Sequence, residues 1–523
     1  MIFKYNIMDR IKILWVDDEI QMLKSHMLFL KERGYDTTPC TNGQDAIDLV
    51  NNNNYEIVLL DENMPGLNGI ETLEEIKKTK PFLPVIMITK NEEERIMEDA
   101  IGAKISDYLI KPVNPNQILL SLKKNLDQKT LIAKKTTQNY QKDFVDLSNS
   151  LNSLLTHHDW VNHYENLIRW EMELENLDDQ SMFEIFKSQK KEANNLFSKF
   201  IEKNYSNWIS NNDGPLLSHQ IFRKSIFPKL KQHKPTILLV IDNLRLDQWN
   251  VIRSEFLNSY IIDNETSYFS ILPTATQYSR NALFAGLTPL EIQKQYPEWW
   301  KYDHEEGGKN LNEENLLRAQ CLRLGIDRPI SYHKLNEISK SQQLIKTLQN
   351  HIHECLTVIV FNFVDMISHA KTEMEMIKEL APNDKAYRSL TLSWFKNSSL
   401  KKLIDKAAKL NFQLILTTDH GTINVTNPSE VISDKDTSMN LRYKTGRSLT
   451  FKSKDVYDCV SPGDLKLPSI SLNSRYIFSK GDNYFVYKKN YNHFANFFRQ
   501  TYQHGGISLE EMIVPFVVLS PRK

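Results

Sequence analysis

The most constraining feature of the sequence is an alternation of short apolar runs with amphipathic stretches in its first part. The runs have the length and composition of buried strands, as in IKILWV and EIVLL, and the stretches between them have helical spacing. Strands and helices that alternate at this spacing predict a parallel sheet covered by helices. An α/β fold is therefore expected at 1–128, in the form of a doubly wound (βα)5 domain.

The texture of the sequence changes twice beyond this first part. Residues 129–230 contain few β-branched runs and have aromatic residues at helical spacing, so Trp160, Trp170 and Trp208 are expected to pack between helices. After that, apolar strand runs return between long helical or irregular stretches. The sequence therefore predicts an all-α domain at 129–230 and a second α/β domain at 231–523.

The bulk composition argues against several classes of protein. Lys and Arg number 65 and so do Asp and Glu, so the chain lacks the positive surplus of a protein that grips a nucleic acid backbone. The four cysteines lie far apart and form no CxxC pair, which is typical of reduced thiols. No apolar run reaches membrane-spanning length and no signal-peptide pattern opens the chain, so we expect a cytoplasmic protein without membrane insertion.

Polar side chains follow the predicted strands of the first domain, at the point where each strand ends. Asp17 and Asp18 follow ILWV, Asp61 follows IVLL, Thr89 follows VIMI, and Lys111 follows DYLI. These ends share one edge of a parallel sheet. Three carboxylates repel one another there unless a cation neutralises them, and hard oxygen ligands favour Mg²⁺. Lys111 would then pair with an added phosphoryl group, and Thr89 would hydrogen-bond one of its oxygens.

This domain resembles the receiver domain of two-component response regulators over nearly its whole length. The resemblance is carried by Asp17, Asp18, the segment DENMPGLNG from Asp61, Thr89, Tyr108 and the KP pair at 111 and 112. It implies that a cognate histidine kinase phosphorylates Asp61, and that Thr89 and Tyr108, with Lys111, form the switch. It also implies a Mg²⁺ site made by Asp17, Asp18, Asp61 and the backbone carbonyl of Asn63.

The C-terminal domain has Asp and His residues at the ends of its predicted strands. They are Asp242 after ILLVI, Asp365 after VIVFNFV, Asp419 and His420 after LILTT, and His504 in YQHGG, with His369 four residues beyond Asp365. A single Asp-His pair at a strand end is more often a capped turn than a site. As a set, mixed imidazole and carboxylate ligands suit Zn²⁺, with Mn²⁺ as the competitor. Two ions about 4 Å apart form the clamp used for in-line phosphoryl displacement.

The segment SILPTATQYSRNALFAGL at 270–287 offers a nucleophile. Thr276, with Thr274 as the alternative, stands in a turn before a predicted helix, and a helix N-terminus presents free N–H groups to an anion. A threonine hydroxyl bound to a metal loses its proton more readily than a free one. Taken alone, the segment is better explained as an ordinary turn and helix cap.

Together these residues resemble the alkaline phosphatase superfamily, in its nucleotide pyrophosphatase/phosphodiesterase and PglZ branches. The segment HGGISLEEMIVP also resembles the terminal motif of PglZ domains. The resemblance implies two zinc ions per chain. One would be held by Asp242, Thr276, Asp419 and His420, and the other by Asp365, His369 and His504.

The sequence departs from the phosphodiesterase branch after the nucleophile. That branch usually continues its Thr motif with Pro-Asn-His, whereas Gln277, Tyr278 and Ser279 follow Thr276 here. The departure leaves the substrate open. Arg442, Lys444 and Arg447 in NLRYKTGRS are candidate phosphate-binding residues, with a solvated basic loop as the alternative.

A receiver, a helical connector and a PglZ-like domain in this order resemble the response regulators associated with type IX secretion. This resemblance implies a homodimer when Asp61 is phosphorylated, and a sigma factor as a candidate partner. We expect a phosphorylation-controlled, zinc-dependent phosphodiesterase in which Thr276 attacks nucleotide-type diesters, such as cyclic or short oligonucleotides. The competing hypothesis is a non-catalytic, zinc-stabilised scaffold that binds a sigma factor or secretion component, and a DNA-binding regulator is the third.

Overall fold

The computed structural model describes most of the chain, which divides into two compact units at 1–142 and 143–523. The described residues are 11–81, 83–90, 105–151, 153–177, 181–211, 213–230, 234–373, 379–433, 438, 440–469, 471 and 473–522. Within these ranges the side chains at 127–134, 338, 363, 369–371 and 373 lie outside the description. Among the described helices, none is long and apolar enough to cross a membrane.

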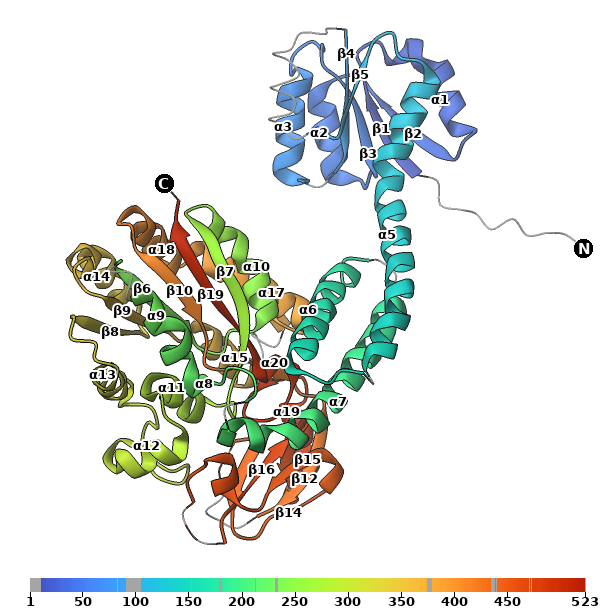
Figure 1. Ribbon diagram of the computed structural model, residues 1–523. Coiled ribbons are helices and arrows are strands. Elements are labelled where there is room, and N and C mark those ends of the chain that lie inside the picture. Colours follow the sequence, from blue (N-terminus) through green and yellow to red (C-terminus); the bar gives the residue numbers. More distant parts are fainter. Residues whose placement is uncertain are drawn as a thin grey trace, which may run out of the picture. The chain divides into compact units, whose positions relative to one another are not determined.

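The first unit is built on a parallel sheet of five strands in the order β2-β1-β3-β4-β5 (Figure 1). Leu14 and Val16 lie in one hydrophobic core and Ile13 and Trp15 in another, because successive side chains of a strand point to opposite faces. The predicted doubly wound fold is confirmed. The strands are β1 (Ile11–Val16), β2 (Tyr35–Cys40), β3 (Ile57–Asp61), β4 (Val85–Thr89) and β5 (Asp107–Ile110), and the helices are α1 (Lys24–Lys31), α2 (Gly43–Asn52), α3 (Gly69–Thr79) and α5 (Pro115–Leu151).

The middle of the chain is helical, as predicted, and is formed by the end of α5 with α6 (His157–Leu174) and α7 (Ser181–Asn211). Trp160 of α6 is buried against Phe197 of α7, with ring centroids 5.3 Å apart. Trp208 packs differently, because its ring lies 5.9 Å from Phe269 at the end of strand β7 (Tyr260–Phe269). The helices of the second unit therefore pack on its sheet as well as on one another.

The second unit contains a sheet of six strands in the order β7-β19-β10-β6-β9-β8. The four strands β10, β6, β9 and β8 are parallel, and β19 runs antiparallel to both of its neighbours. Ser508 caps the short helix before β19, because its side chain accepts from the N–H of Glu511. The strands not yet bounded are β6 (Thr236–Ile241), β8 (Ile330–Leu335), β9 (Leu356–Phe361), β10 (Gln413–Thr417) and β19 (Ile513–Pro521).

Helices cover both faces of this sheet (Figure 1). Helices α10, α17, α18 and α14 pack in sequence along one face, and α8, α11 and α13 pack along the other. The helices are α8 (Ser218–Ile221), α9 (Phe227–Leu230), α10 (Leu246–Leu257), α11 (Thr276–Ala285), α12 (Pro289–Gln295), α13 (Glu313–Arg323), α14 (Ile338–Thr347), α15 (Phe363–Glu373), α17 (Asp384–Asn397), α18 (Ser399–Lys409), α19 (Tyr491–Phe498) and α20 (Leu509–Met512).

A strand-rich insertion separates β10 from β19, where the sequence indicated helical or irregular chain. It contains two three-stranded sheets, β14-β12-β17 and β13-β16-β15, and the antiparallel pair β11-β18. Its strands are β11 (Ile423–Asn424), β12 (Asn427–Ile432), β13 (Tyr443–Gly446), β14 (Thr450–Phe451), β15 (Val456–Cys459), β16 (Arg475–Ser479), β17 (Asn483–Tyr487) and β18 (Tyr502–Gln503). The β11-β18 pair brings the two ends of the insertion together beside the end of β10.

Candidate functional site

The ligands predicted in the second unit follow three neighbouring strands, β10, β6 and β9. The register of β6 with its two neighbours keeps their carboxyl ends level. Asp242 comes directly after β6, Asp419 and His420 come shortly after β10, and Asp365 lies in the first turn of α15, which follows β9. The structure therefore places these four residues at one edge of the sheet, where α/β folds bind their ligands.

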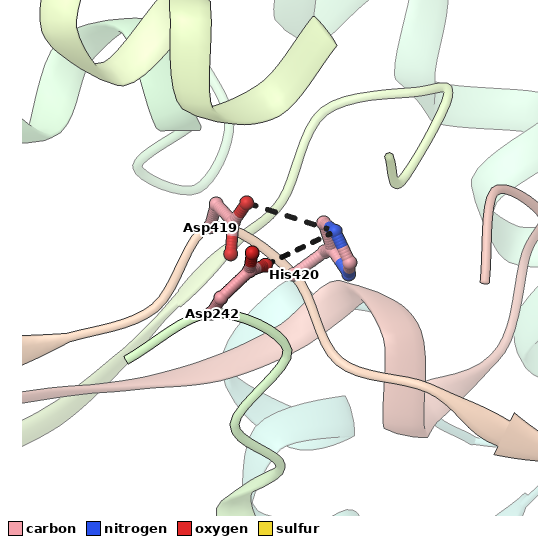
Figure 2. A group of neighbouring side chains, drawn as sticks. All are labelled: Asp242, Asp419 and His420. Atoms are coloured by element: carbon pink, nitrogen blue, oxygen red, sulfur yellow. Dashed lines mark ion pairs between the residues drawn. The ribbon is translucent and has the colours of Figure 1, made fainter. Parts of the chain in front are cut away.

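Asp242, Asp419 and His420 form a buried cluster at this edge (Figure 2). His420 Nε2 lies 3.6 Å from Asp419 Oδ2 and 4.0 Å from Asp242 Oδ1. Thr276 Oγ1 lies 3.1 Å from His420 Nε2 and 3.5 Å from Asp242 Oδ1. A tetrahedral ion with bonds of about 2.0 Å holds its ligand atoms roughly 3.3 Å apart. The observed separations therefore fit the zinc site predicted for these four residues.

The hydrogen bonds of the two predicted histidine ligands fix which nitrogen is free. His420 Nδ1 lies 3.0 Å from the carbonyl of Gly421, and His504 Nδ1 lies 3.1 Å from the carbonyl of Thr274. A carbonyl can only accept, so each Nδ1 carries a hydrogen and each neutral ring presents a lone pair at Nε2. The rings stack with centroids 4.2 Å apart. Both imidazoles are thus oriented as metal ligands usually are.

The two candidate nucleophiles differ in exposure and in partners. Thr274 is fully buried, donates to the carbonyl of Gly506 and accepts from the N–H of Gly505. Thr276 begins α11 and is the one partly exposed residue of the described segment 271–285. The geometry therefore favours Thr276 as the nucleophile. Thr274 instead holds the backbone that directly follows His504 in place.

The three residues that depart from the phosphodiesterase pattern bond to the protein itself. Gln277 Nε2 donates to the carbonyl of Lys301 at 2.6 Å, and the Tyr278 hydroxyl donates to Asp303 at 3.0 Å. Ser279 donates to the carbonyl of Ala275, one turn earlier. These side chains thus hold α11 and the segment around 301–303.

An arginine that the sequence analysis missed lies inside the cluster. Arg280 Nη1 is 2.9 Å from Asp242 Oδ2, and its Nε is 2.9 Å from Glu313 Oε1 and 3.7 Å from Asp419 Oδ2. Lys334 Nζ lies 3.1 Å from the other oxygen of Glu313. Arg280 is one turn beyond Thr276 on the same helix, so i, i+4 spacing was the signal available for it. It leaves Asp242 Oδ1 facing the side of Thr276 and His420.

Burial and neighbouring charges shift the ionisation of the cluster. Burial raises the pKa of Asp242 to about 6, although Arg280 opposes the shift. Burial also acts on Asp419, but His420 in its protonated form and the charge of Arg280 outweigh it and lower the pKa of that carboxyl. Asp419 Oδ2 is buried and accepts no hydrogen bond from the described residues. A buried anionic oxygen of this kind fits a bound cation.

Asn243 links the cluster to the second predicted zinc site. Its backbone is left-handed, with φ of 62°, a conformation that asparagine tolerates better than most residues. Its N–H lies 3.3 Å from Asp419 Oδ1 and its Nδ2 lies 3.0 Å from Ser368 Oγ on α15. Burial, and then the charge of Asp242, hold the pKa of Asp365 well above its usual range.

The second predicted zinc site is described in part. His504 Nε2 lies 3.9 Å from Asp365 Oδ1, so the structure brings these two ligands together. His369 belongs to α15, but its side chain lies outside the described residues. The second set of zinc ligands stays a prediction.

The predicted acidic site of the first unit is also assembled at the edge of its sheet. Asp17, Asp18 and Asp61 place one oxygen each within 4.8 Å of one another, with Asp17 and Asp61 buried and Asp18 exposed. Lys111 Nζ lies 2.8 Å from Asp17 and 3.0 Å from Asp61. Burial raises the pKa of Asp61, although Lys111 opposes the shift. Three acids with hard oxygen donors and one exposed member fit a Mg²⁺ site.

The remaining receiver residues have separate positions. The Thr89 hydroxyl is buried and donates to Glu62. Tyr108 is partly buried and packs against the core, and Asn63 is exposed. A pocket of about 420 Å³ adjoins the site and is lined in part by Asp17, Lys90 and Lys111. The switch roles of Thr89 and Tyr108 and the Mg²⁺ ligation by Asn63 stay predictions.

The basic segment at 440–448 does not form an open phosphate site. Arg442 is fully buried, and its guanidinium donates to both oxygens of Glu511 at 3.1 and 2.7 Å. Lys444 is also buried, which lowers its pKa to about 7, and it donates to the carbonyl of Ser438. Of the three candidates, Arg447 alone is exposed. Arg442 therefore clamps Glu511, a role that requires the folded insertion.

These sites define a class of protein: a phosphorylation-controlled regulator with a hydrolase-like effector. Family models match the chain in three places, as a response regulator receiver domain at 13–123, a PorX response regulator linker domain at 130–209, and a BREX system PglZ alkaline phosphatase-like domain at 221–519. The chain belongs to the PglZ alkaline phosphatase-like family, whose model covers more than half of it. The order of the three matches is the architecture of PorX-type response regulators, and the resemblances to a receiver domain and to a PglZ domain are confirmed.

Two curated relatives match a smaller part of the chain. The transcriptional regulatory protein ResD of Bacillus subtilis is 36% identical over 112 residues, which is 21% of this chain and 46% of ResD. The transcriptional regulatory protein SrrA of Staphylococcus aureus is 27% identical over 135 residues, which is 26% of this chain and 56% of SrrA. The chain spans about half the length of these relatives.

Solved receiver structures match a similar share of the chain. The receiver domain of NtrX from Brucella abortus is 30% identical, with a TM-score of 0.21, covering 22% of this chain and 98% of that one. A CheY-like receiver domain protein from Methanospirillum hungatei is 28% identical, with a TM-score of 0.22, covering 23% and 95%. The family models therefore assign a receiver domain to the first part of the chain and an alkaline phosphatase-like domain to its C-terminal part.

Proposed function

We propose that the chain is a response regulator in which phosphorylation of Asp61 controls a zinc-dependent phosphodiesterase, linked to the regulation of type IX secretion. The parts are a receiver at 1–128, a connector at 129–230 and the effector at 231–523, and the substrates are cyclic or short oligonucleotides. The observation that carries the proposal is the position of Thr276. The residue is partly exposed at the N-terminus of α11, and its Oγ1 lies 3.1 Å from His420 Nε2. A hydroxyl placed there is positioned as a nucleophile.

Two zinc ions per chain are proposed, one on Asp242, Thr276, Asp419 and His420, and one on Asp365, His369 and His504. When bound, zinc would supply a Lewis acid that favours ionisation of the threonine hydroxyl and neutralises charge on the phosphoryl group. The described residues fit this role because their donors are carboxylate oxygens and Nε2 lone pairs, at separations of 3.1 to 4.0 Å around His420 Nε2.

The side chains of the site then act in order. Thr276 loses its hydroxyl proton to solvent, and Oγ1 forms a bond to phosphorus while the bond to the leaving nucleoside oxygen breaks. The free N–H groups at the start of α11 face the phosphoryl oxygens. Arg280 keeps Asp242 fixed through its far oxygen. The leaving oxygen takes a proton from solvent and departs as an alcohol. Water then cleaves the bond between Thr276 Oγ1 and phosphorus, which regenerates the hydroxyl and releases a phosphate monoester.

In the first unit, the acidic site would accept the phosphoryl group on Asp61. Asp17, Asp18, Asp61 and the carbonyl of Asn63 would bind Mg²⁺, and Lys111 would pair with the phosphoryl group on Asp61. Thr89 and Tyr108 would form the switch that leads to a homodimer, with a sigma factor as candidate partner. Support comes from Lys111 Nζ, which already lies within 3.0 Å of both Asp17 and Asp61.

The test is hydrolysis of bis-p-nitrophenyl phosphate and of a short oligoadenylate by the purified chain. Thr276→Ala should lower turnover by about 10³-fold or more, because it removes the nucleophile. Thr276→Ser keeps the hydroxyl and should retain measurable activity. Elemental analysis of the same samples shows whether zinc is bound. Equal activity in wild type and Thr276→Ala would contradict the proposed mechanism.

A second candidate function is a zinc-stabilised scaffold that binds a sigma factor or secretion component. The observation that favours it is the depth of the cluster, because Asp242, Asp419 and His420 are all buried and only Thr276 is partly exposed. Zinc bound without turnover of either diester would support the scaffold over the enzyme.

A further inference from the structure

One side chain of the connector helices, Lys190 on α7, lies among three carboxylates from distant parts of the second unit. Its Nζ is 2.9 Å from Glu171 on α6, 3.1 Å from Glu510 on α20 and 3.8 Å from Asp384 on α17. The Lys190 side chain is 13% exposed, and those of Glu171 and Glu510 are 6% and 3% exposed. The ammonium of Lys190 therefore faces three largely buried acids, of which Asp384 also pairs with Arg245 and Glu171 also lies near Arg388.

Helix α7 holds the segment around α20 at two further points, each one turn beyond the last. Asn194 Nδ2 donates to Glu510 Oε2 at 3.1 Å, and its Oδ1 accepts from the N–H of Leu509 at 2.8 Å. Ser198 donates to the carbonyl of Ile507 at 3.4 Å. Residues spaced by four on a helix share one face, so one face of α7 contacts the whole segment 507–510.

The segment that α7 contacts packs in turn against the backbone of Gly421, which orients His420. The N–H of Gly421 donates to the carbonyl of Glu511 at 3.1 Å. A Cβ on Gly421 would lie 2.0 Å from the carbonyl oxygen of Glu510, so only glycine allows this approach. The carbonyl of Gly421 is the partner of His420 Nδ1. A shift of Glu510 would therefore move the group that fixes the ring of His420.

A second branch reaches the other strand ends through Asp384. Asp384 Oδ1 accepts from the hydroxyl of Tyr502 at 2.8 Å and from Arg245 Nη1 at 2.7 Å. Tyr502 lies two residues before His504, and Arg245 lies three residues after Asp242. Lys190 is thus connected, through Asp384, to both backbone segments that carry these predicted ligands.

The neighbour of Lys190 connects the same helix to α5. Gln189 Nε2 lies 2.8 Å from Ser148 Oγ and 3.2 Å from the carbonyl of Phe144, both on α5. Helix α5 is continuous from Pro115, shortly after the last strand of the receiver sheet. A displacement of α5 would therefore act on Gln189 through these two hydrogen bonds, and through it on the adjacent Lys190.

We propose that Lys190 is a positioning residue for the metal centre, through which α5 and α7 regulate the affinity of that centre for zinc. The inference rests on the proposed function, because it takes Asp242, His420 and His504 as ligands. Lys190 touches none of them. It fixes Glu510 and Asp384, and these fix the backbone on which the ligands stand.

The test compares zinc affinity in full-length variants, measured by competition with a chromophoric chelator and without substrate. Lys190→Met should bind zinc about 10- to 100-fold more weakly, the range typical for loss of groups that support metal ligands. Lys190→Arg keeps the cation and should restore most of the affinity. Lys191→Met is the matched control, because the Lys191 side chain is 50% exposed and pairs with Asp482 at 3.4 Å. Its affinity should equal that of wild type.

A second variant covers the case in which Lys190→Met does not fold. Glu510→Gln removes the same ion pair with little change of shape and should also weaken zinc binding. Unchanged affinity in Glu510→Gln, or in a folded Lys190→Met, would overturn the proposal. A wild-type chain that binds zinc but hydrolyses no diester would contradict the proposed function alone, since the affinity comparison still decides the role of Lys190. A wild-type chain that binds no zinc would overturn both.

The route through α5 has its own test. Beryllofluoride with Mg²⁺ should change the zinc affinity of the wild-type chain, because it mimics the phosphoryl group on Asp61. Gln189→Leu loses both hydrogen bonds to α5 and should abolish that change while Lys190 remains. An equal change in wild type and Gln189→Leu would exclude this route.

Discussion

The acidic site around Asp61 and the cluster around Asp242 both lie at the carboxyl edge of a parallel sheet, but different cations neutralise them. In the first unit the cation is Lys111, whose side chain is 15% exposed, and Asp18 beside it is exposed. In the second unit it is Arg280, whose side chain is 1% exposed. The first site is therefore open to solvent on the side of Asp18. The second is built around a permanent internal charge.

The two sites also differ in their donor atoms. The first offers carboxylate oxygens, which suit Mg²⁺, and the second adds the Nε2 lone pair of His420, which suits zinc. If both sites act as proposed, the same topological position would serve a reversible switch where it is open to solvent, and would hold a metal tightly where it is buried and contains an imidazole.

The largest effect is expected from removing the internal cation. Arg280→Met leaves Asp242, Glu313 and Asp419 without their shared partner, so the free energy of unfolding of the metal-free second unit should fall by about 3–5 kcal/mol. Lys111→Met should cost the first unit only about 1–2 kcal/mol, because Lys111 is itself partly exposed and the site opens to solvent at Asp18. Denaturant unfolding of the two variants measures both values.

Arg318→Met serves as the control for Arg280, because Arg318 is exposed and pairs with Glu314 on the surface of α13. It should change stability by less than about 0.5 kcal/mol. Equal losses for Arg280→Met and Lys111→Met would mean that burial does not separate the two sites.

An intermediate effect is expected from acid, and it should fall on the second unit. Burial lowers the pKa of His163 on α6 to about 4, and its Nε2 has no hydrogen-bond partner among the described residues. Because the folded pKa is depressed, the stability it contributes is present above about 6.5 and is lost as the pH falls toward 4. The full contribution is about 3 kcal/mol. The first unit has one histidine, His26, which is only partly buried.

His163→Phe should flatten this part of the pH dependence. The measurement is urea unfolding of wild type and variant at pH 7 and pH 5, followed by tryptophan fluorescence. A parallel decline in both proteins would assign the acid sensitivity to other groups.

The smallest effect in free energy is expected from the phosphorylation site. Asp61→Ala should remove the dimerisation that beryllofluoride and Mg²⁺ induce, a coupling of about 1–3 kcal/mol or roughly 5- to 150-fold in dimer affinity. Light scattering measures the dimer, and elemental analysis should show unchanged zinc. A dimer that persists in Asp61→Ala would remove the switch from the proposal, and lost zinc would mean that the two sites are not separate.

Much of this architecture could be predicted because its signals are local. The apolar runs before Asp61, Asp242 and Asp419 are strands because each is short, continuous and bounded by polar residues, and parallel strands bring such ends to one edge. The Ser508 cap is likewise local, because Ser508 bonds to the N–H of Glu511 only three residues later. The order of the Asp, Thr and His motifs carried the family resemblance.

The strand-rich insertion and its consequences could not be predicted in the same way. Its short strands are half-buried and pair over long separations, so no local period marks them. The stacking of His504 on His420 depends on the β11-β18 pair, which closes a loop of some eighty residues. The burial of Arg442 on Glu511 depends on the same insertion.

By itself, the sequence determined the two sheets, the helical connector and the types of residue at the strand ends, because strand and helix patterns are set by neighbours along the chain. The tertiary structure alone decided that Thr276 faces the cluster while Thr274 bonds to Gly506, that Arg280 is the cation inside the cluster, and that Lys190 of α7 pairs with Glu510. Ion pairs and buried hydrogen bonds join residues far apart in sequence, and their partners are fixed only when the layers pack.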